Sequence, residues 1–116
     1  MEVLGLVFAA TPTERRPEMA AFAAEVLGLE RVGAEDMDAD LFALPDGAFL
    51  AVADPRGPGD TARSVGFLVA DVAAAAAELR AAGLDVGEPS ENERFRYTHF
   101  RAPDGKLYEL VEKREA

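Results

Sequence analysis

Phe42-Ala43-Leu44-Pro45-Asp46-Gly47 and Phe100-Arg101-Ala102-Pro103-Asp104-Gly105 follow the same pattern, 58 positions apart in the chain. A single Pro-Asp-Gly is an ordinary turn signal, because proline and glycine suit the backbone angles of tight turns. Here each copy is preceded by the same series of predicted elements and is followed by a predicted strand. Such a recurrence indicates an internal repeat, which decides the fold before any single element does.

The first copy lies near the end of a predicted β-α-β-β-β series. The short apolar run 3–10 predicts a buried strand, and residues 16–27 predict a helix that ends at Gly28. One face of that helix carries apolar residues at spacings of three and four, namely Met19, Phe22, Ala23 and Val26. Three further strands are predicted at 29–34, 40–44 and 48–53, with an acidic turn over 35–40.

The second copy closes an equivalent series. A strand is predicted at 64–70, then an alanine-rich helix that is capped by Asp71, runs to Ala82 and is stopped by Gly83. The remaining strands are predicted at 84–87, 94–101 and 106–112, with a polar loop over 88–93. The chain therefore divides into module 1 at about 1–54, a Pro- and Gly-rich linker at 55–62 and module 2 at about 63–116, and the 116 residues are predicted to form a single domain.

Composition narrows the classes of partner. Twelve basic and 22 acidic residues give a net charge of −10, which disfavours nucleic acid and favours a cationic ligand. The chain has no cysteine, which excludes disulfides and thiolate chemistry. No apolar run is long enough to span a bilayer, and the N-terminus lacks the basic segment of a signal peptide. We therefore expect a cytoplasmic protein that binds neither membranes nor nucleic acid.

Three stretches in order resemble the vicinal oxygen chelate superfamily, which includes glyoxalase I, extradiol dioxygenases and bleomycin-resistance proteins. They are Phe22 with Glu25-Val26-Leu27-Gly28-Leu29, then Gly66 to Val72, and then Ala102 to Leu110. The resemblance implies an α+β fold in which two tandem βαβββ modules form a curled, incomplete mixed β-barrel with the helices outside. It also implies a ligand in the concave cup and a homodimer.

Enzymes of this superfamily hold one divalent metal ion with side chains from the first, fourth, fifth and eighth strands. Carried over, the eighth-strand ligand is Glu109 and the fourth-strand position is Ala51. The fifth-strand position is Ser64, and the first-strand position falls near Leu4 or Gly5. Since a stable site needs several oxygen or nitrogen donors, the sequence predicts no metal and no other cofactor.

The cup predicted by the resemblance is mostly apolar, with few polar groups. Strand alternation places Glu109 with Leu107, and the only histidine, His99, with Tyr97 and Phe95. The predicted ligand-binding residues are Phe49, Ala51, Ser64, Phe95, Tyr97, His99, Leu107 and Glu109. His99 and Glu109 are the candidates for acid–base chemistry, because a carboxylate can orient an imidazole.

Phe8, Phe42, Phe49 and Phe67 are interpreted as core or pocket lining, and Arg94, Arg96 and Arg101 as solvent-facing.

Three functions remain open. The first is a metal-independent protein that binds a small hydrophobic or cationic aromatic molecule. The second is a lyase, isomerase or dioxygenase-like enzyme with non-standard metal ligands such as Glu109 and His99. The third is an interaction module whose cup is filled by its own side chains.

Overall fold

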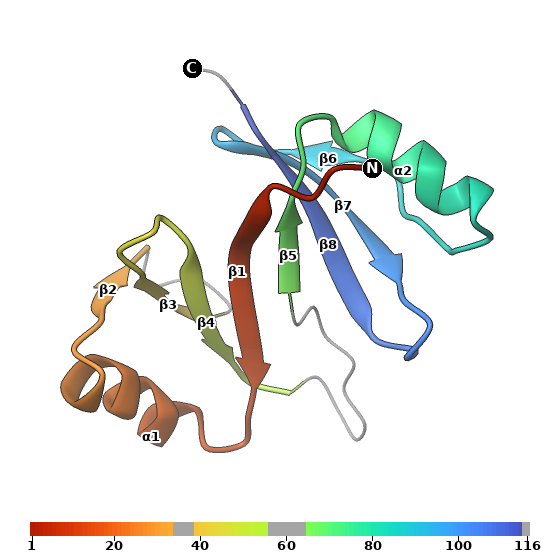
Figure 1. The fold of residues 1–116 in the computed structure, drawn as a ribbon. Helices are drawn as coiled ribbons and strands as arrows, with labels where there is room; N and C mark the ends of the chain where they lie inside the picture. Colours follow the sequence, from red (N-terminus) through yellow and green to blue (C-terminus); the bar gives the residue numbers. More distant parts are fainter. Residues whose placement is uncertain (34–38, 56–64, 115–116) are drawn as a thin grey trace.

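The computed structural model describes residues 1–33, 39–55 and 65–114, which form an eight-stranded mixed sheet with two helical segments (Figure 1). The strands are β1 (Gly5–Pro12), β2 (Glu30–Val32), β3 (Ala39–Ala43), β4 (Phe49–Ala53), β5 (Val65–Leu68), β6 (Ser90–Glu91), β7 (Phe95–Arg101) and β8 (Leu107–Lys113). They lie side by side in the order β2-β3-β4-β1-β5-β8-β7-β6. In the described part of the chain the sheet is therefore open, and the predicted incomplete barrel is confirmed.

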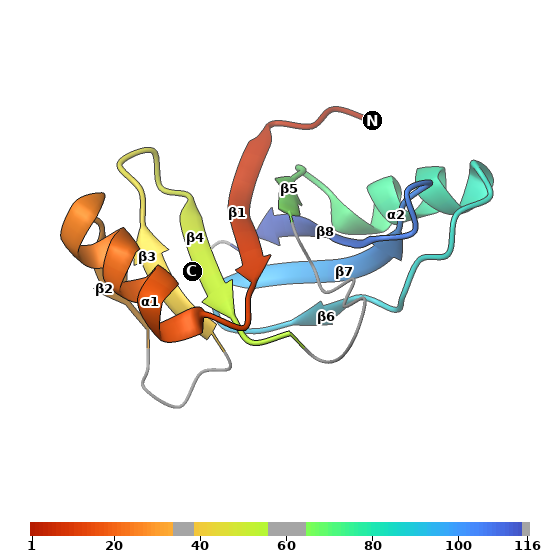
Figure 2. The ribbon, with the colours of Figure 1, turned by 90° about the horizontal axis from the view of Figure 1, so that it is seen from below.

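The two modules are built alike and are joined through their first strands. β1 runs parallel to β4 and β5 runs parallel to β8, while β1 and β5 pair antiparallel at the centre of the sheet. Figure 2 shows the β1–β4 half on one side of this junction and the β5–β8 half on the other. The linker predicted at 55–62 falls almost entirely outside the described residues, as does most of the predicted turn at 35–40.

The two Pro-Asp-Gly turns have matching hydrogen bonds. Asp46 Oδ1 accepts the amide hydrogen of Ala48 at 2.9 Å, and Asp104 Oδ1 accepts that of Lys106 at the same distance. The glycine that follows each aspartate has a positive φ, 89° at Gly47 and 81° at Gly105, where a side chain would be strained. The repeat seen in the sequence is thus reproduced in the backbone.

Helical segments follow the first strand of each module. In module 1, α1 (Arg16–Ala21) continues into the π-helix η1 (Phe22–Val26) and ends at Gly28, whose φ is 70°. In module 2, α2 (Val72–Ala81) begins at Asp71, whose carboxylate accepts the Ala74 amide hydrogen at 3.1 Å as predicted. None of the helices in the described ranges is long and apolar enough to cross a membrane.

The predicted apolar face of the first helix is only partly correct. Ala23 is fully buried and Met19 partly so, but Phe22 is 43% exposed and Val26 is 71% exposed. The last turn is widened, because the Leu27 amide donates to the Phe22 carbonyl five residues back, and this displaces Val26 from the predicted face. A π-turn changes the angular spacing of side chains, so residues three and four apart no longer share a face.

The strand predicted at 84–87 is also wrong. Only Val86 forms a bridge there, to Phe100, and the edge strand β6 lies instead at Ser90–Glu91, within the predicted polar loop. Pro89, which has no amide hydrogen, separates the two segments. The β6 residues pair with Tyr97 and Arg96 of β7.

One face of the sheet packs against the helices. In module 1, Phe42 and Val52 are fully buried against Ala20 and Ala23. In module 2, Val69, Val72, Ala75, Phe100 and Leu110 form the core cluster. The rings of Phe67, Phe100 and Tyr108 stack on this same face, with centroids 5.8–6.4 Å apart. Because strand side chains alternate, the residues between these form a second face, which we call the helix-free face.

A network of ion pairs links α1, β2, β3 and the end of β4 in module 1. Asp40 accepts hydrogen bonds from Arg16 Nε at 3.0 Å and from Arg31 Nη1 at 2.8 Å, and Arg16 Nη1 also donates to Asp54 at 2.9 Å. These four side chains line an open depression beside α1. Since its charges are paired with one another, we interpret the network as a structural link between α1, β2, β3 and the end of β4.

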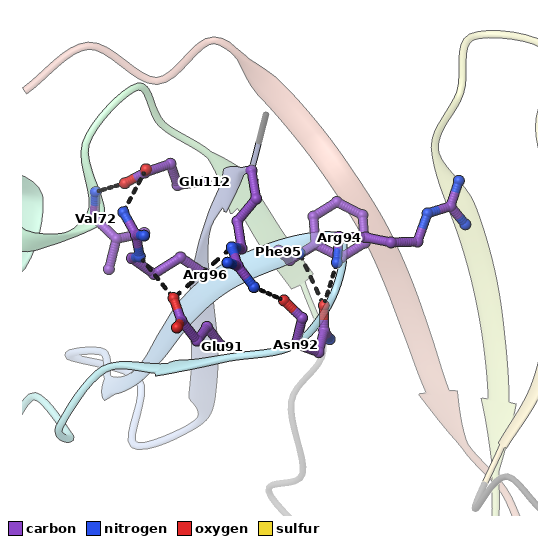
Figure 3. A network of polar contacts seen from close by, with 8 residues as sticks. Val72, Glu91, Asn92, Arg94, Phe95, Arg96 and Glu112 are labelled. Atoms are coloured by element: carbon purple, nitrogen blue, oxygen red, sulfur yellow. Dashed lines mark hydrogen bonds and ion pairs between the residues drawn. The ribbon is translucent and has the colours of Figure 1, made fainter. Parts of the chain in front are cut away.

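A second network fixes the outer edge of module 2 (Figure 3). Glu112 accepts hydrogen bonds from the Val72 amide at 2.9 Å and from Arg96 Nη1 at 3.1 Å. Arg96 Nε donates to Glu91 at 3.2 Å, and the Asn92 side chain accepts the amide hydrogens of Arg94 and Phe95. These contacts join β6, β7, β8 and the start of α2. The three arginines predicted to face solvent, Arg94, Arg96 and Arg101, are all exposed.

We expect Asp40→Asn to lower the free energy of unfolding at neutral pH by about 1–3 kcal/mol, because it removes a charged acceptor shared by two guanidinium groups. The hydrogen bond from Arg16 holds the pKa of the Asp40 carboxyl below its ordinary value of 3.8. The stabilisation is therefore complete well above pH 3.8 and is lost as the pH falls through the lower pKa of the folded state. Urea unfolding at neutral and acidic pH measures both effects.

The matched control is Glu93→Gln, which makes the same charge change at an exposed position; we expect it to change stability by less than about 0.5 kcal/mol. The interpretation would be contradicted by equal stabilities of Asp40→Asn and the wild type at neutral pH. It would also be contradicted by a difference that grows as the pH falls below 3.8.

Candidate functional site

The helix-free face carries almost all of the predicted site residues. Strand pairing places them there through cross-strand partners that share one side of the sheet. Its members include Phe8, Ala10, Leu41, Ala43, Phe49, Ala51, Gly66, Leu68, Phe95, Tyr97, His99, Arg101, Leu107, Glu109, Val111 and Lys113. Seven of the eight predicted ligand-binding residues are in this set, and the eighth, Ser64, lies outside the described residues.

Five of these residues form one row across the middle of the sheet. Phe49 of β4 pairs with Phe8 of β1, Phe8 pairs with Gly66 of β5, Gly66 pairs with Glu109 of β8, and Glu109 pairs with His99 of β7. We call this row Phe49–Phe8–Gly66–Glu109–His99 the central row. It places two aromatic rings at one end and a carboxylate with an imidazole at the other.

Glu109 and His99 lie close enough to interact. His99 Nε2 is 3.5 Å from Glu109 Oε2, and the exposed fractions of the two side chains are 32% and 11%. Next to this pair, the Tyr97 ring lies tilted against the His99 ring with centroids 5.9 Å apart. Val111, which pairs with both Leu68 and Tyr97, is 2% exposed. The carboxylate thus sits in a largely apolar setting with an imidazole beside it, and Arg101, which pairs with Leu107, lies on the same face.

The backbone around His99 is held from both sides. β8 pairs with β7 over its whole length, and on the other side the Gly87 amide donates to the His99 carbonyl at 2.8 Å. The Thr98 hydroxyl donates to the Gly87 carbonyl at 2.6 Å, and Thr98 is 1% exposed. The position of His99 is therefore set by the packed strand rather than by a loop. Phe95, by contrast, lies four residues along β7, about 13 Å from His99 at 3.3 Å per residue.

The Phe8 ring occupies the space that a side chain at position 66 would need. A Cβ atom built at position 66 would lie 2.6 Å from Cδ1 of the Phe8 ring and closer still to Cε1, which is nearer than real Cβ atoms approach. Gly66 is buried and its φ is not positive, so the requirement here is for space rather than for an unusual backbone. The half-buried Phe8 ring thus covers the strand directly beside Glu109.

The counterparts of Glu109 and His99 in module 1 carry only hydrocarbon. Glu109 pairs with His99 in module 2, and in module 1 Ala51 pairs with Leu41 in the same register. Ala51 is 8% exposed. Module 1 therefore presents an apolar surface in the position where module 2 presents its acid and its imidazole.

The pairing corrects the predicted first-strand position. Ala10 pairs with Ala51 as Gly66 pairs with Glu109, so Ala10 is the counterpart of Gly66. Two residues earlier, Phe8 corresponds to Ser64, and the first-strand position falls on Phe8 rather than near Leu4 or Gly5. Equivalent residues of the two modules are 56 positions apart in the first strands, as Ala10 and Gly66 are, but 58 positions apart at the turns, as Asp46 and Asp104 are. The sequence shows only the 58-residue repeat of the turns, so the position of Phe8 follows from the strand register, as does that of Gly66.

The described residues do not fit the metal site that the fold family uses. Glu109 and His99 provide two donor side chains on the central row, while Phe8 and Ala51 provide none. Within 1–33, 39–55 and 65–114, no three His, Cys, Asp or Glu side chains are grouped so that they could hold a metal ion. Divalent ions in such sites need more donors than this pair supplies.

Two βαβββ modules joined through their first strands in an open sheet are the architecture that the resemblance in the sequence implied. No family model and no curated protein matches the sequence. Solved structures do share the fold. A methylmalonyl-CoA epimerase from Mycobacterium tuberculosis superposes with a TM-score of 0.74 at 22% identity, over 97% of this chain and 90% of that one.

Two further structures show how widely the fold is used. A Streptomyces coelicolor methylmalonyl-CoA epimerase has a TM-score of 0.67 at 20% identity, over 98% of this chain and 100% of that one. BphC, a halotolerant catechol dioxygenase, has a TM-score of 0.78 at 18% identity, over 98% of this chain but only 41% of that one. At these identities the similarity establishes the shared fold.

We expect added Mn²⁺, Ni²⁺ or Zn²⁺ to shift the melting temperature of the chelator-treated protein by less than about 1 °C, because two donors bind a metal ion too weakly to stabilise the folded state. Differential scanning fluorimetry measures the shift, and elemental analysis of protein purified without chelator measures bound metal. Stoichiometric metal, or a saturable rise in melting temperature that is lost in Glu109→Gln, would contradict this interpretation.

Proposed function

We propose that the protein binds a small organic molecule on the helix-free face without the aid of a metal ion. The observation that carries this proposal is the central row, in which aromatic rings and an acid–imidazole pair lie in register on rigid strands. Binding sites commonly combine an apolar surface with a few well-placed polar groups. The central row has this composition, and the packed core behind it holds it in place.

The apolar side chains of this face favour a hydrophobic ligand, and the negative charge favours a ligand that is cationic and aromatic. The net charge of −10 attracts cations over the whole protein surface, and Glu109 places one carboxylate in a mostly apolar setting. A cationic group on the ligand would add a favourable interaction to those that the Glu109 carboxylate already makes, including the one with His99. An anionic ligand would meet repulsion from both sources.

A second candidate is an enzyme that moves a proton on a bound substrate. The observation that favours it is the 3.5 Å contact between His99 and Glu109, since such a pair can act as acid and base when a substrate proton is within reach. Two of the similar solved structures are epimerases, and one is a catechol dioxygenase. In this candidate the same residues bind the ligand and also change it.

Screening a panel of neutral and cationic aromatic compounds by thermal shift tests the proposal. We expect cationic aromatic members to raise the melting temperature of the wild type. Glu109→Gln should weaken their binding by about tenfold or more, since it removes a charged partner from a desolvated position. Glu93→Gln, an exposed control, should bind as the wild type does.

Mass spectrometry of the recovered compound separates the two candidates. The binding proposal predicts that the compound is recovered unchanged after prolonged incubation. Turnover that is lost in both His99→Gln and Glu109→Gln would favour the enzyme instead. Absence of binding by every member of the panel would contradict both candidates and favour an interaction module.

A further inference from the structure

We propose that Phe8 and Gly66 fix the orientation of the ligand, so that an aromatic body lies over Phe8 and a cationic group meets Glu109. This inference rests on the proposed function and adds to it two residues and a direction. It identifies the ligand class as an aromatic cation whose positive charge lies at one end.

The register of the central row brings the ring and the carboxylate together. Phe8, Gly66 and Glu109 are direct partners on three adjacent strands, β1, β5 and β8. Neighbouring strands lie about 4.8 Å apart, so the Cα atoms of Phe8 and Glu109 are separated by about 10 Å with only a glycine between them. The Phe8 ring covers that glycine, and therefore no side chain of the row separates the ring from the carboxylate.

The chemistry of both groups selects a positive charge. The face of an aromatic ring carries negative electrostatic potential, which attracts ammonium and other organic cations. The Glu109 carboxylate adds a full negative charge, and with 11% of its side chain exposed it is weakly screened by water. A cation placed between the ring and the carboxylate is attracted by both.

The remaining residues of the face favour one orientation of the ligand along the central row. Beyond Phe8 the row continues to Phe49, and the module 1 counterparts of the acid–imidazole pair are Ala51 and Leu41. A charged group placed over module 1 would lose water without gaining a charged partner on this face. The apolar end of the ligand therefore belongs over Phe8 and Phe49, and the charged end belongs over Glu109.

Two probes of equal shape test the orientation. The first is naphthylmethyl-trimethylammonium, and the second is its uncharged isostere, in which carbon replaces nitrogen. Binding is measured by naphthalene fluorescence for the wild type, Phe8→Leu, Gly66→Ala and Glu109→Gln. The controls are Gly5→Ala, where an added Cβ meets nothing within 4 Å, and Phe22→Leu on the exposed surface of η1. Amide NMR spectra establish that each variant is folded.

We expect the wild type to prefer the cation to the isostere by about tenfold or more, and Glu109→Gln to lose that preference. Phe8→Leu should weaken the cation about fivefold or more, because leucine keeps apolar bulk but lacks the ring. Gly66→Ala should weaken both probes, because its Cβ displaces the Phe8 ring. The two controls should bind as the wild type does.

Three results would overturn the inference. If Phe8→Leu and Gly66→Ala bind as the wild type while Glu109→Gln loses binding, the orientation is wrong but the binding proposal stands. If Phe8→Leu binds both probes more tightly, the ring blocks the site rather than stacking on a ligand. If the wild type binds neither probe, the inferred ligand class is wrong, and the compound panel then decides whether the binding proposal also fails.

Discussion

The antiparallel pairing of β1 with β5 is the contact on which both the sheet and the candidate site depend. It joins two modules that otherwise have separate cores, one around Phe42 and Val52 and one around Phe100 and Leu110. Its register also decides which residues meet at the centre of the helix-free face. A shift of one residue would turn Gly66 toward α2 and bring Phe67 to the face instead, and the central row would no longer exist.

The two modules have kept the same backbone but not the same chemistry. Their Pro-Asp-Gly turns share hydrogen bonds and glycine conformations, and their strands pair in equivalent registers. On the helix-free face, however, His99 and Glu109 stand where module 1 has Leu41 and Ala51. A pseudo-symmetric sheet thereby acquires one polar and one apolar end. That polarity can orient a ligand, whereas a symmetric face could not.

The sequence alone was enough to predict the order of elements, the open mixed sheet and the face on which seven of the predicted site residues lie. The order of elements and the shared face depend on local signals such as strand alternation, the Asp71 cap and the repeated turns, whereas the open mixed sheet was implied by the family resemblance. The errors arose where tertiary structure overrides local pattern. Neither the π-turn around Val26 nor the displaced edge strand β6 has a distinct periodicity in the sequence. The fit of the Phe8 ring over Gly66 depends on a register between strands that are distant in sequence, and it therefore required the structure. The homodimer and the cytoplasmic location stay predictions.

The most direct measurement is a crystal structure of the protein in complex with the compound that binds most tightly, with anomalous diffraction data to detect metal ions. We expect the compound to lie on the helix-free face, with its aromatic part against Phe8 and its charged group beside Glu109, and no anomalous peak between them. A compound held through a metal ion on Glu109, or one bound in the depression beside α1, would contradict it.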